Sequence, residues 1–265
     1  MVAPFITFLS DYGLEDEFVG VCHGVIAGIC PEAVVIDVTH GVPRGDVRSG
    51  AHILGNALRY LPRGVHLAVV DPGVGSERRG VALRLADDRF LVGPDNGLLS
   101  LAADAGGGIV EAVDIGASPF ALQPVSATFH GRDIFAPVAA RLAGGAALAD
   151  AGTPIDASAL VAVELPRAQM VDGVLVAHAL YIDRFGNVQL DVEEPELELG
   201  RSFEVTARSG RSESVRYVRT FADAGSGELI LYEDSSRRLA VAVNQGDAAA
   251  RLGVAVDDEL RIRLD

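Results

Sequence analysis

With 265 residues, 49 % of them hydrophobic and 22 % charged, the chain can bury the core of one large or two small globular domains, which excludes a mainly disordered protein. The formal net charge is −15 and no basic patch stands out, so the composition argues against a nucleic-acid-binding protein. All 22 basic residues are arginine, and the lack of lysine excludes Schiff-base chemistry and a Walker-type phosphate loop.

The first half of the chain alternates apolar strand-like runs with segments whose apolar residues recur at helical spacing. Near-continuous apolar strands that alternate with helices are typical of a parallel sheet covered by helices. Asp46 is placed to act as the N-cap of the second helix. Strands are expected at 5–9, 33–38, 65–71, 81–92 and 109–115, and helices at 17–29, 46–61 and 134–142.

The second half changes character after a small-residue stretch that contains prolines. Short strand candidates then follow one another between turn residues, a spacing typical of a small β-barrel or sandwich. These strands are expected at 173–182, 188–192, 202–207, 213–219, 227–232, 238–243 and 259–264. The sequence therefore predicts an α/β domain over 1–160, a linker over 161–172 and an all-β domain over 173–265.

The two cysteines, Cys22 and Cys30, give neither a disulfide framework nor a zinc ligand set, and we expect both to be small buried hydrophobic residues. The six histidines show no HExxH or other paired-ligand spacing, so no metal site is expected. The first residues lack the basic region of a signal peptide, and no apolar run approaches the roughly 20 residues that span a bilayer. A cytoplasmic protein without membrane contacts is expected.

Acidic residues follow two of the predicted strands. Asp11 comes after the first strand, with Asp16 five residues further on, and Asp71 comes after the third. Ligands of parallel sheets bind beyond the carboxyl ends of the strands, where such a carboxylate can accept both hydroxyls of a ribose. Acids before a helix also serve as caps and compensate the helix dipole. The sequence leaves both interpretations open for Asp11.

The glycine-rich turn at 71–79 lacks both GxGxxG spacing and a lysine, so it is a poor candidate for a phosphate loop. It does place Asp71 close in sequence to Arg78 and Arg79, on a backbone that can approach a ligand closely. His130 stands at the expected start of a helix, where a histidine taken alone is more often structural than catalytic.

Two segments of the second half could be plain turns or parts of a binding site. Residues 183–187 suit a tight turn, but Phe185 and Asn187 could also hold a purine by stacking and hydrogen bonds. Residues 235–238 could form a hairpin loop, or their hydroxyls and guanidinium groups could hold a carboxylate.

Six segments in the same order make the whole chain resemble the S-adenosylmethionine hydrolases, or hydroxide adenosyltransferases, which are related to the fluorinases and chlorinases. Several motifs in order are far more specific than any one of them. The segments are Leu9-Ser10-Asp11-Tyr12-Gly13, Val69-Val70-Asp71-Pro72-Gly73-Val74-Gly75, Gly93-Pro94-Asp95-Asn96-Gly97, Phe129-His130-Gly131-Arg132-Asp133, Asp183-Arg184-Phe185-Gly186-Asn187 and Ser235-Ser236.

The resemblance implies an α/β domain followed by a β-barrel domain. It also implies a homotrimer in which each active site lies between one subunit's N-terminal domain and its neighbour's C-terminal domain. S-adenosylmethionine would be the substrate, and no cofactor is implied. The family's Asp–Arg–His set would be Asp71, Arg78 and His130.

The resemblance assigns the remaining site residues to the substrate. Asp11 would bind the ribose, Asp16 matches a second acid nearby, and Asp183 would meet the methionine ammonium group. The other matches divide between the adenine and the methionine carboxylate, and Arg237 stands where the family usually has glycine. The adenine residues would be Phe185, Asn187 and Phe221, and the carboxylate residues would be Ser235, Ser236 and the neighbouring Arg237.

Hydrolysis is favoured over halogenation by two positions. The halogenases resemble this chain but have tyrosine in place of Asp71, and the fluorinase has Tyr-Ser in place of His130 and Gly131, its serine helping to hold the halide. Water is therefore the expected nucleophile at the ribose 5′ carbon. Arg78 would hold the water, and His130, charge-balanced by Asp71, would accept its proton. A halogenase and a non-catalytic S-adenosylmethionine or adenosine binder are the alternatives.

Overall fold

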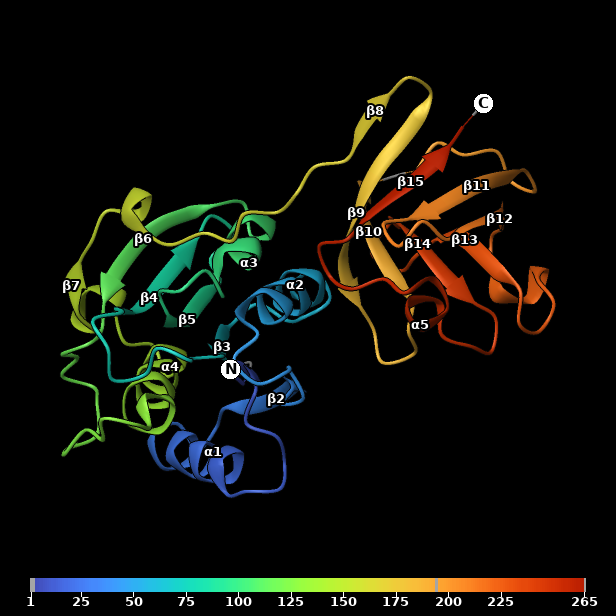
Figure 1. The fold of residues 1–265 in the computed structure, drawn as a ribbon. Helices are drawn as coiled ribbons and strands as arrows, with labels where there is room; N and C mark the ends of the chain where they lie inside the picture. Colours follow the sequence, from blue (N-terminus) through green and yellow to red (C-terminus); the bar gives the residue numbers. More distant parts are fainter. Residues whose placement is uncertain (1–2, 194, 265) are drawn as a thin grey trace. The chain divides into compact units, whose positions relative to one another are not determined.

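The computed structural model describes residues 3–193 and 195–264. It divides into two compact units, the first ending at Val163 and the second beginning at Glu164 (Figure 1). The segment 161–172, expected to be a linker, includes a short strand, β8, that pairs with the second unit's sheet. Each unit has its own hydrophobic core and is described by itself.

A seven-stranded sheet forms the centre of the first unit, in the order β2-β1-β3-β5-β4-β6-β7. The pairs from β2 to β5 are parallel, whereas β4, β6 and β7 add on as antiparallel strands. The α/β architecture is confirmed, with a sheet that is mixed. The strands are β1 Phe5–Ser10, β2 Val34–Thr39, β3 Val65–Val69, β4 Gly80–Leu85, β5 Phe90–Pro94, β6 Ile109–Asp114 and β7 Thr153–Pro154.

The single strand predicted over 81–92 is wrong, because the chain reverses within it. Leu85 accepts the N–H of Asp88 and donates its own N–H to Arg89, which closes a tight turn between β4 and β5. Asp88 has φ +67°, a left-handed conformation that aspartate tolerates better than most residues. The paired acids at 87 and 88 were the sequence signal for this turn.

Helices cover both faces of the first sheet (Figure 1). On one face α1 packs through Cys22 and Ile26, together with α4, into a core with β1 and β3. On the other face α2 packs beside α3. Asp46 accepts the N–H of Ser49 (3.0 Å), which confirms the predicted N-cap. The helices are α1 Phe18–Ile29, α2 Val47–Leu58, α3 Ser100–Ala105 and α4 Ala136–Ala143, with a π-helical turn at Gly131–Phe135 and 3₁₀ turns at Leu148–Asp150 and Ala157–Ala159.

The second unit is a β-barrel, as expected. Strand β10 pairs with both β14 and β9, which closes seven strands into a ring, and β8 extends the sheet beside β9. The strands are β8 Gln169–Val171, β9 Val174–Ile182, β10 Val188–Glu193, β11 Ser202–Ala207, β12 Ser212–Tyr217, β13 Leu229–Glu233, β14 Arg238–Val243 and β15 Glu259–Arg263, with a 3₁₀ turn at Phe221–Asp223 and one helix, α5 Ala248–Leu252.

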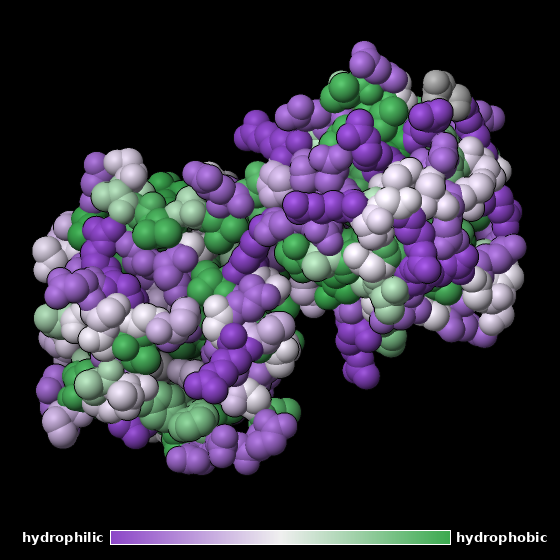
Figure 2. All heavy atoms as spheres, in the orientation of Figure 1, coloured by the Kyte–Doolittle hydropathy of each residue, from purple (hydrophilic) through white to green (hydrophobic). Residues whose placement is uncertain are grey.

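Polar and apolar side chains are interspersed over the face of the molecule shown in Figure 2. Cys22 and Cys30 are buried and free, as predicted. Within the described ranges, no helix combines the length and apolar character that crossing a bilayer requires. A cytoplasmic location stays a prediction from the sequence.

Candidate active site

Two parallel strands bring their terminal acids to one edge of the first sheet. Ser10, the last residue of β1, is in register with Val69, the last residue of β3. Asp11 continues this pairing, with its N–H directed at the Val69 carbonyl (3.4 Å). Asp71 follows β3 at the same edge, so both acids lie where parallel sheets commonly bind ligands.

Asp71 forms a two-point ion pair with Arg78. Nε of Arg78 donates to Oδ1 of Asp71 (2.8 Å), and Nη2 donates to Oδ2. Both side chains are about nine-tenths buried, with 11 % of Arg78 and 7 % of Asp71 exposed. A planar guanidinium held at two points by a carboxylate has a fixed orientation, which a lysine could not reproduce.

The turn that carries this ion pair depends on a glycine. Gly75 has φ +78°, and a Cβ there would lie 2.6 Å from the carbonyl oxygen of Ala127. Both observations exclude a larger residue without strain. The close approach brings the 71–78 turn against the segment just before His130.

His130 contacts Arg78 and not Asp71 directly. Nη2 of Arg78 lies 2.9 Å from Nδ1 of His130. Because a guanidinium can only donate, Nδ1 is the acceptor, and the neutral ring carries its proton on Nε2. Burial, and then the Arg78 charge, lower the pKa of His130 against an opposing effect of Asp71. The ring is therefore held in its neutral form.

This order of contacts corrects the expected arrangement. The sequence predicted that Asp71 orients His130 and balances its charge. The charge of Asp71 does raise the pKa of His130, but Arg78 lies between the two side chains and makes the contact that orients the ring. Phe135 packs against both side chains. The centre of its ring lies 5.2 Å from the Arg78 guanidinium carbon and 6.4 Å from the centre of the His130 ring. His130 directly precedes the π-helical turn Gly131–Phe135 and Phe135 is its last residue; this type of distortion is frequent at functional sites.

A cavity of about 380 Å³ opens beside these residues. Its aromatic wall is made by Tyr12, Phe18 and Phe129, whose ring centroids lie 5.3–5.8 Å apart. This volume falls within the range of small-molecule pockets. The cavity is lined by Asp11, Tyr12, Phe18, Asp71, Val74, Thr128, Phe129, His130 and Gly131.

Tyr12 is the least expected member of the wall. Burial, with smaller contributions from Cys22 and Asp11, raises the pKa of its hydroxyl above the usual range, so the group stays protonated. A Cβ on Gly131 would lie only 2.1 Å from this hydroxyl oxygen. The tyrosine hydroxyl thus occupies the space that any side chain at position 131 would need.

The two acids near the first turn differ in position. Asp11 lines the cavity and accepts the N–H of Gly45 through Oδ2 (2.8 Å), so it also fixes the chain between β2 and α2. Asp16 is exposed in the segment before α1 and lies outside the group that lines the cavity. The structure therefore joins Asp11, but not Asp16, to the Asp71, Arg78 and His130 set.

The segment 93–97 has a structural role within the same unit. Asp95 is buried, accepts both Nε and Nη2 of Arg79, and accepts the N–H of Val161 (2.8 Å). It ties the last segment of the unit to the sheet. A Cβ on Gly93 would lie 2.3 Å from the Ala68 carbonyl oxygen, so a glycine is needed for strand packing.

In the second unit, Asp183 organises the turn between β9 and β10. Its Oδ1 accepts the N–H groups of Phe185 (2.8 Å) and Asn187 (3.0 Å), and its Oδ2 accepts Nδ2 of Asn187 (2.8 Å). These bonds present the Phe185 ring to solvent with 65 % of the residue exposed. An exposed aromatic ring on a fixed turn is available for stacking.

The hairpin between β13 and β14 is held in a similar way by Asp234. Its Oδ1 accepts the N–H groups of Ser236 (2.8 Å) and Arg238 (3.0 Å). Arg237 has φ +63°, a left-handed conformation that glycine adopts at no steric cost. This backbone geometry accounts for the glycine that the resemblance leads one to expect at this position.

Tyr232 lies near Phe221, Asp234 and Asp183, and the sequence analysis did not single it out. Its ring lies 5.1 Å from that of Phe221, and burial, followed by the charges of Asp234 and Asp183, raises the pKa of its hydroxyl. Phe221 packs with it against a small buried cluster. Tyr232 lies in an ordinary strand pattern, and Phe18 and Phe129 likewise carried no signal beyond being apolar.

The comparisons with known proteins decide the family. A model described as the SAM hydroxide adenosyltransferase N-terminal domain matches residues 6–152, and its C-terminal counterpart matches 177–261. The chain belongs to the SAM hydroxide adenosyltransferase family. Together the two models span both units of this family member.

Similar proteins named (R)-S-adenosyl-L-methionine hydrolase include one from Salinispora tropica, 54 % identical over 98 % of this chain and 97 % of the relative. Another, from Thermus thermophilus, is 39 % identical over 94 % and 95 %. A protein named Fluorinase, from an Actinoplanes species, is 29 % identical over 93 % of each chain. This chain is thus more similar to these hydrolases than to that fluorinase.

A solved structure of an uncharacterised conserved protein from Thermotoga maritima has the same fold. It superimposes with a TM-score of 0.90 and 33 % sequence identity, over 97 % of this chain and 99 % of that one. The fold of this chain therefore has an experimental counterpart over 97 % of its length.

Proposed function

We propose that this protein is a hydrolase that cleaves S-adenosyl-L-methionine into adenosine and L-methionine. The observation that carries the proposal is the contact set of Asp71, Arg78 and His130 at the edge of a cavity, in a chain 54 % identical to a named S-adenosyl-L-methionine hydrolase. The contact set supplies a positive charge and oriented ring and carboxylate groups, which suit the positioning of a water molecule.

The reaction is an in-line displacement at the ribose 5′ carbon. A lone pair of the water oxygen forms the new C–O bond as the C–S bond breaks, and the bonding pair leaves with sulfur as a neutral thioether, so no general acid is required. Nε2–H of His130 donates a hydrogen bond to one lone pair of the water oxygen. This bond orients the other lone pair of the same oxygen toward the 5′ carbon. Arg78 fixes the His130 ring in the tautomer that makes this donation.

The proton balance assigns a different role to Asp71 than the sequence suggested. As the C–O bond forms, the attacking water becomes an oxonium, which is acidic enough to lose its proton to a carboxylate. Nδ1 of His130 is occupied by Arg78 and Nε2 carries the ring proton, so His130 has no site for it. Asp71 lines the cavity and accepts the proton, which later passes to solvent.

Two observations favour water over halide as the nucleophile. Position 71 carries a carboxylate, whose negative charge repels a halide. The Tyr12 hydroxyl lies where a serine at position 131 would have to project, and the fluorinase resemblance gives that serine a role in holding halide. The cavity beside His130 thus lacks the room for the halogenase arrangement.

The substrate contacts follow from the same assignment. Asp11 accepts the ribose hydroxyls, with Asp16 nearby, and Asp183 meets the methionine ammonium group. We extend this to a homotrimer in which one subunit's first unit faces its neighbour's second unit. The adenine would then contact Phe185, Asn187 and Phe221, and the methionine carboxylate would contact Ser235, Ser236 and Arg237.

The deciding experiment is product identification after incubation with S-adenosylmethionine in oxygen-18 water, with and without chloride. We expect adenosine that carries oxygen-18 and methionine without the label, in amounts independent of chloride. A 5′-chloro product would overturn hydrolysis in favour of halogenation. Bound but unchanged substrate would overturn it in favour of a binding protein.

The shared site is tested by mixing two inactive variants, Arg78→Ala and Asp183→Ala, after dissociation and reassembly. Sites made from two subunits regain activity in mixed trimers, because some combine an intact first unit with a neighbour's intact second unit. Activity that stays at the level of the separate variants, in trimers shown to be mixed by mass spectrometry, would exclude sharing.

A further inference from the structure

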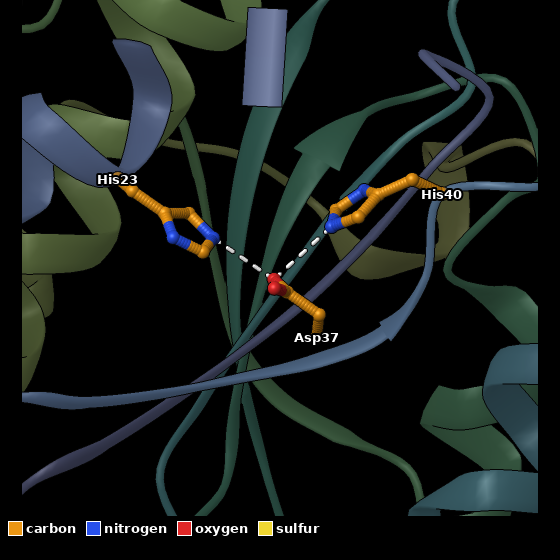
Figure 3. Close-up of side chains that lie close together, drawn as sticks. All are labelled: His23, Asp37 and His40. Carbon is orange, nitrogen blue, oxygen red and sulfur yellow. Dashed lines mark hydrogen bonds and ion pairs between the residues drawn. The ribbon is translucent and has the colours of Figure 1, made fainter. Parts of the chain in front are cut away.

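Three metal-ligand side chains from separate parts of the first unit converge near the active-site edge. His23 lies in α1, Asp37 lies in β2, and His40 follows β2. Oδ1 of Asp37 lies 2.9 Å from Nε2 of His23 and 3.0 Å from Nε2 of His40. Figure 3 shows the two imidazole rings pointing at the carboxylate from opposite sides. One ligand atom from each residue lies within 4.8 Å of the other two.

His40 is the side chain that needs explanation. Only 3 % of it is exposed, and its Nε2 makes no hydrogen bond despite its short distance to Asp37. A buried imidazole nitrogen without a hydrogen-bond partner is costly, and native structures rarely keep one without a reason. The direction of this nitrogen toward the carboxylate is therefore informative.

The other nitrogen of His40 is already engaged. Nδ1 lies 2.7 Å from Oγ of Ser10, which also accepts the N–H of Tyr12. When Nδ1–H donates to this hydroxyl, Nε2 presents a lone pair to the carboxylate of Asp37. In this tautomer the two acceptors, 3.0 Å apart, repel each other unless a proton or a metal ion lies between them. A ligating histidine whose second nitrogen is fixed by a neighbour is the usual arrangement at metal sites.

We propose that His23, Asp37 and His40 bind a divalent transition-metal ion, with Zn²⁺ the best match. Two imidazole nitrogens and one carboxylate oxygen form a known zinc ligand type. Zinc bonds of about 2.0–2.1 Å place tetrahedral ligand atoms roughly 3.3 Å apart. The two nitrogen–oxygen distances of 2.9 Å and 3.0 Å are close to this value, and the two imidazole nitrogens lie within 4.8 Å of each other, so rotation of the side chains would bring all three atoms to one ion. His23 and Asp37 are partly exposed, which leaves the fourth position to water.

Spacing along the chain could not reveal this site, although Asp37 and His40 are three residues apart. His23 stands 14 positions before Asp37, and only the fold brings the helix against the strand. No metal was expected because the histidines lack a paired motif, but that argument covers only ligands that are close in sequence. The convergence of the three side chains revises the expectation.

The position of the ion links it to the substrate-binding edge. His40 holds Ser10 through Nδ1, and its carbonyl accepts the N–H of Gly13 (2.8 Å). Asp11 and Tyr12 lie between these two attachment points. A metal that fixes His40 therefore stabilises the segment that lines the cavity, without touching the substrate. The ion is a structural one, and binding does not depend on the reaction proposed above.

The experiment titrates ZnCl₂ into chelator-treated, desalted protein by calorimetry, and repeats the titration with Co²⁺ while recording its visible d–d absorption. We expect one high-affinity ion per chain and Co²⁺ bands that Zn²⁺ removes. The variant His23→Gln removes a partly exposed ligand and should weaken binding at least 100-fold. The matched control is His178→Gln, which breaks a His–Asp pair of 2.9 Å in the second unit and should bind as the unchanged protein does.

No saturable binding, or His23→Gln affinity equal to that of the unchanged protein, overturns the proposal. Loss of binding in His178→Gln alone would place the ion elsewhere and overturns it too. Thermal unfolding gives a second readout, because Zn²⁺ should raise the Tm of the unchanged protein and of His178→Gln but not that of His23→Gln. None of these measurements requires S-adenosylmethionine, so their failure is distinguishable from failure of the hydrolase proposal.

Discussion

The hydroxyl oxygen of Tyr12 lies 2.1 Å from the point where a Cβ on Gly131 would stand. No real pair of atoms tolerates this distance, so a side chain at 131 must displace Tyr12 from the cavity wall. Tyr12 packs against Phe18 and Phe129, and moving it would disturb the whole wall. The choice of glycine at 131 is thus tied to the choice of tyrosine at 12.

Replacing Gly131 by serine should lower kcat/KM by at least 10-fold because Tyr12 is pushed into the substrate space. The double variant Tyr12→Phe, Gly131→Ser should recover only part of the loss, since the next ring atom, Cζ, lies 3.2 Å from the same point. Steady-state adenosine production measures both. Full activity in Gly131→Ser alone would show that the pocket adapts freely.

Arg78→Lys should reduce kcat by about 100-fold or more while KM changes little. A lysine keeps the charge but loses the two-point bond to Asp71 and the bond that sets the His130 tautomer. Arg84→Lys is the matched control, because Arg84 forms a partly exposed ion pair with Glu111 and neither residue is among those that line the cavity. Equal activity of the Arg78→Lys variant and the control would refute the positioning role.

The pH profile should report the neutral His130 ring. Burial and Arg78 lower its pKa below the ordinary value of about 6.5, so the active neutral form persists through neutral pH. We expect kcat/KM to be constant above neutrality and to fall only as the pH drops through this lowered pKa. An acid limb with its midpoint above 6.5 would contradict the assignment, and nitrogen-15 NMR should find the ring proton on Nε2.

Arg237→Gly should separate backbone strain from substrate binding. Removing the left-handed non-glycine residue should raise the free energy of unfolding by about 1 kcal/mol. If Arg237 contacts the methionine carboxylate, KM should rise at the same time, although the protein is more stable. Denaturant unfolding and steady-state kinetics measure the two effects, and an unchanged KM would remove Arg237 from the site.

Local patterns predicted much of the fold. The apolar runs of the first half predicted β1, β2 and β3, and Asp46 marked the start of α2. The register of parallel strands then explains why acids after β1 and β3 meet, since residues 10 and 69 lie side by side.

Contacts between distant elements were beyond reach of such patterns. The order Asp71, Arg78, His130 depends on a turn that Gly75 brings against Ala127, a contact across 52 positions. The aromatic wall draws on three separate segments, and apolar residues look alike whether they line a cavity or fill a core. The contact of His23 with Asp37 was likewise not predictable, because it depends on how α1 packs beside β2.

The order of the first strands has one more consequence. From β1 the chain crosses through α1 to β2 on one side, and from β2 it returns through α2 to β3 on the other. The two crossovers cover opposite faces of the sheet, and β1 leads to β2 on one side whereas β3 leads to β4 and β5 on the other, so the ends of β1 and β3 border a topological switch point. The order of the strands therefore determines where the active site lies. Other side chains at the same loop positions would line a cavity at the same place and could carry out a different reaction.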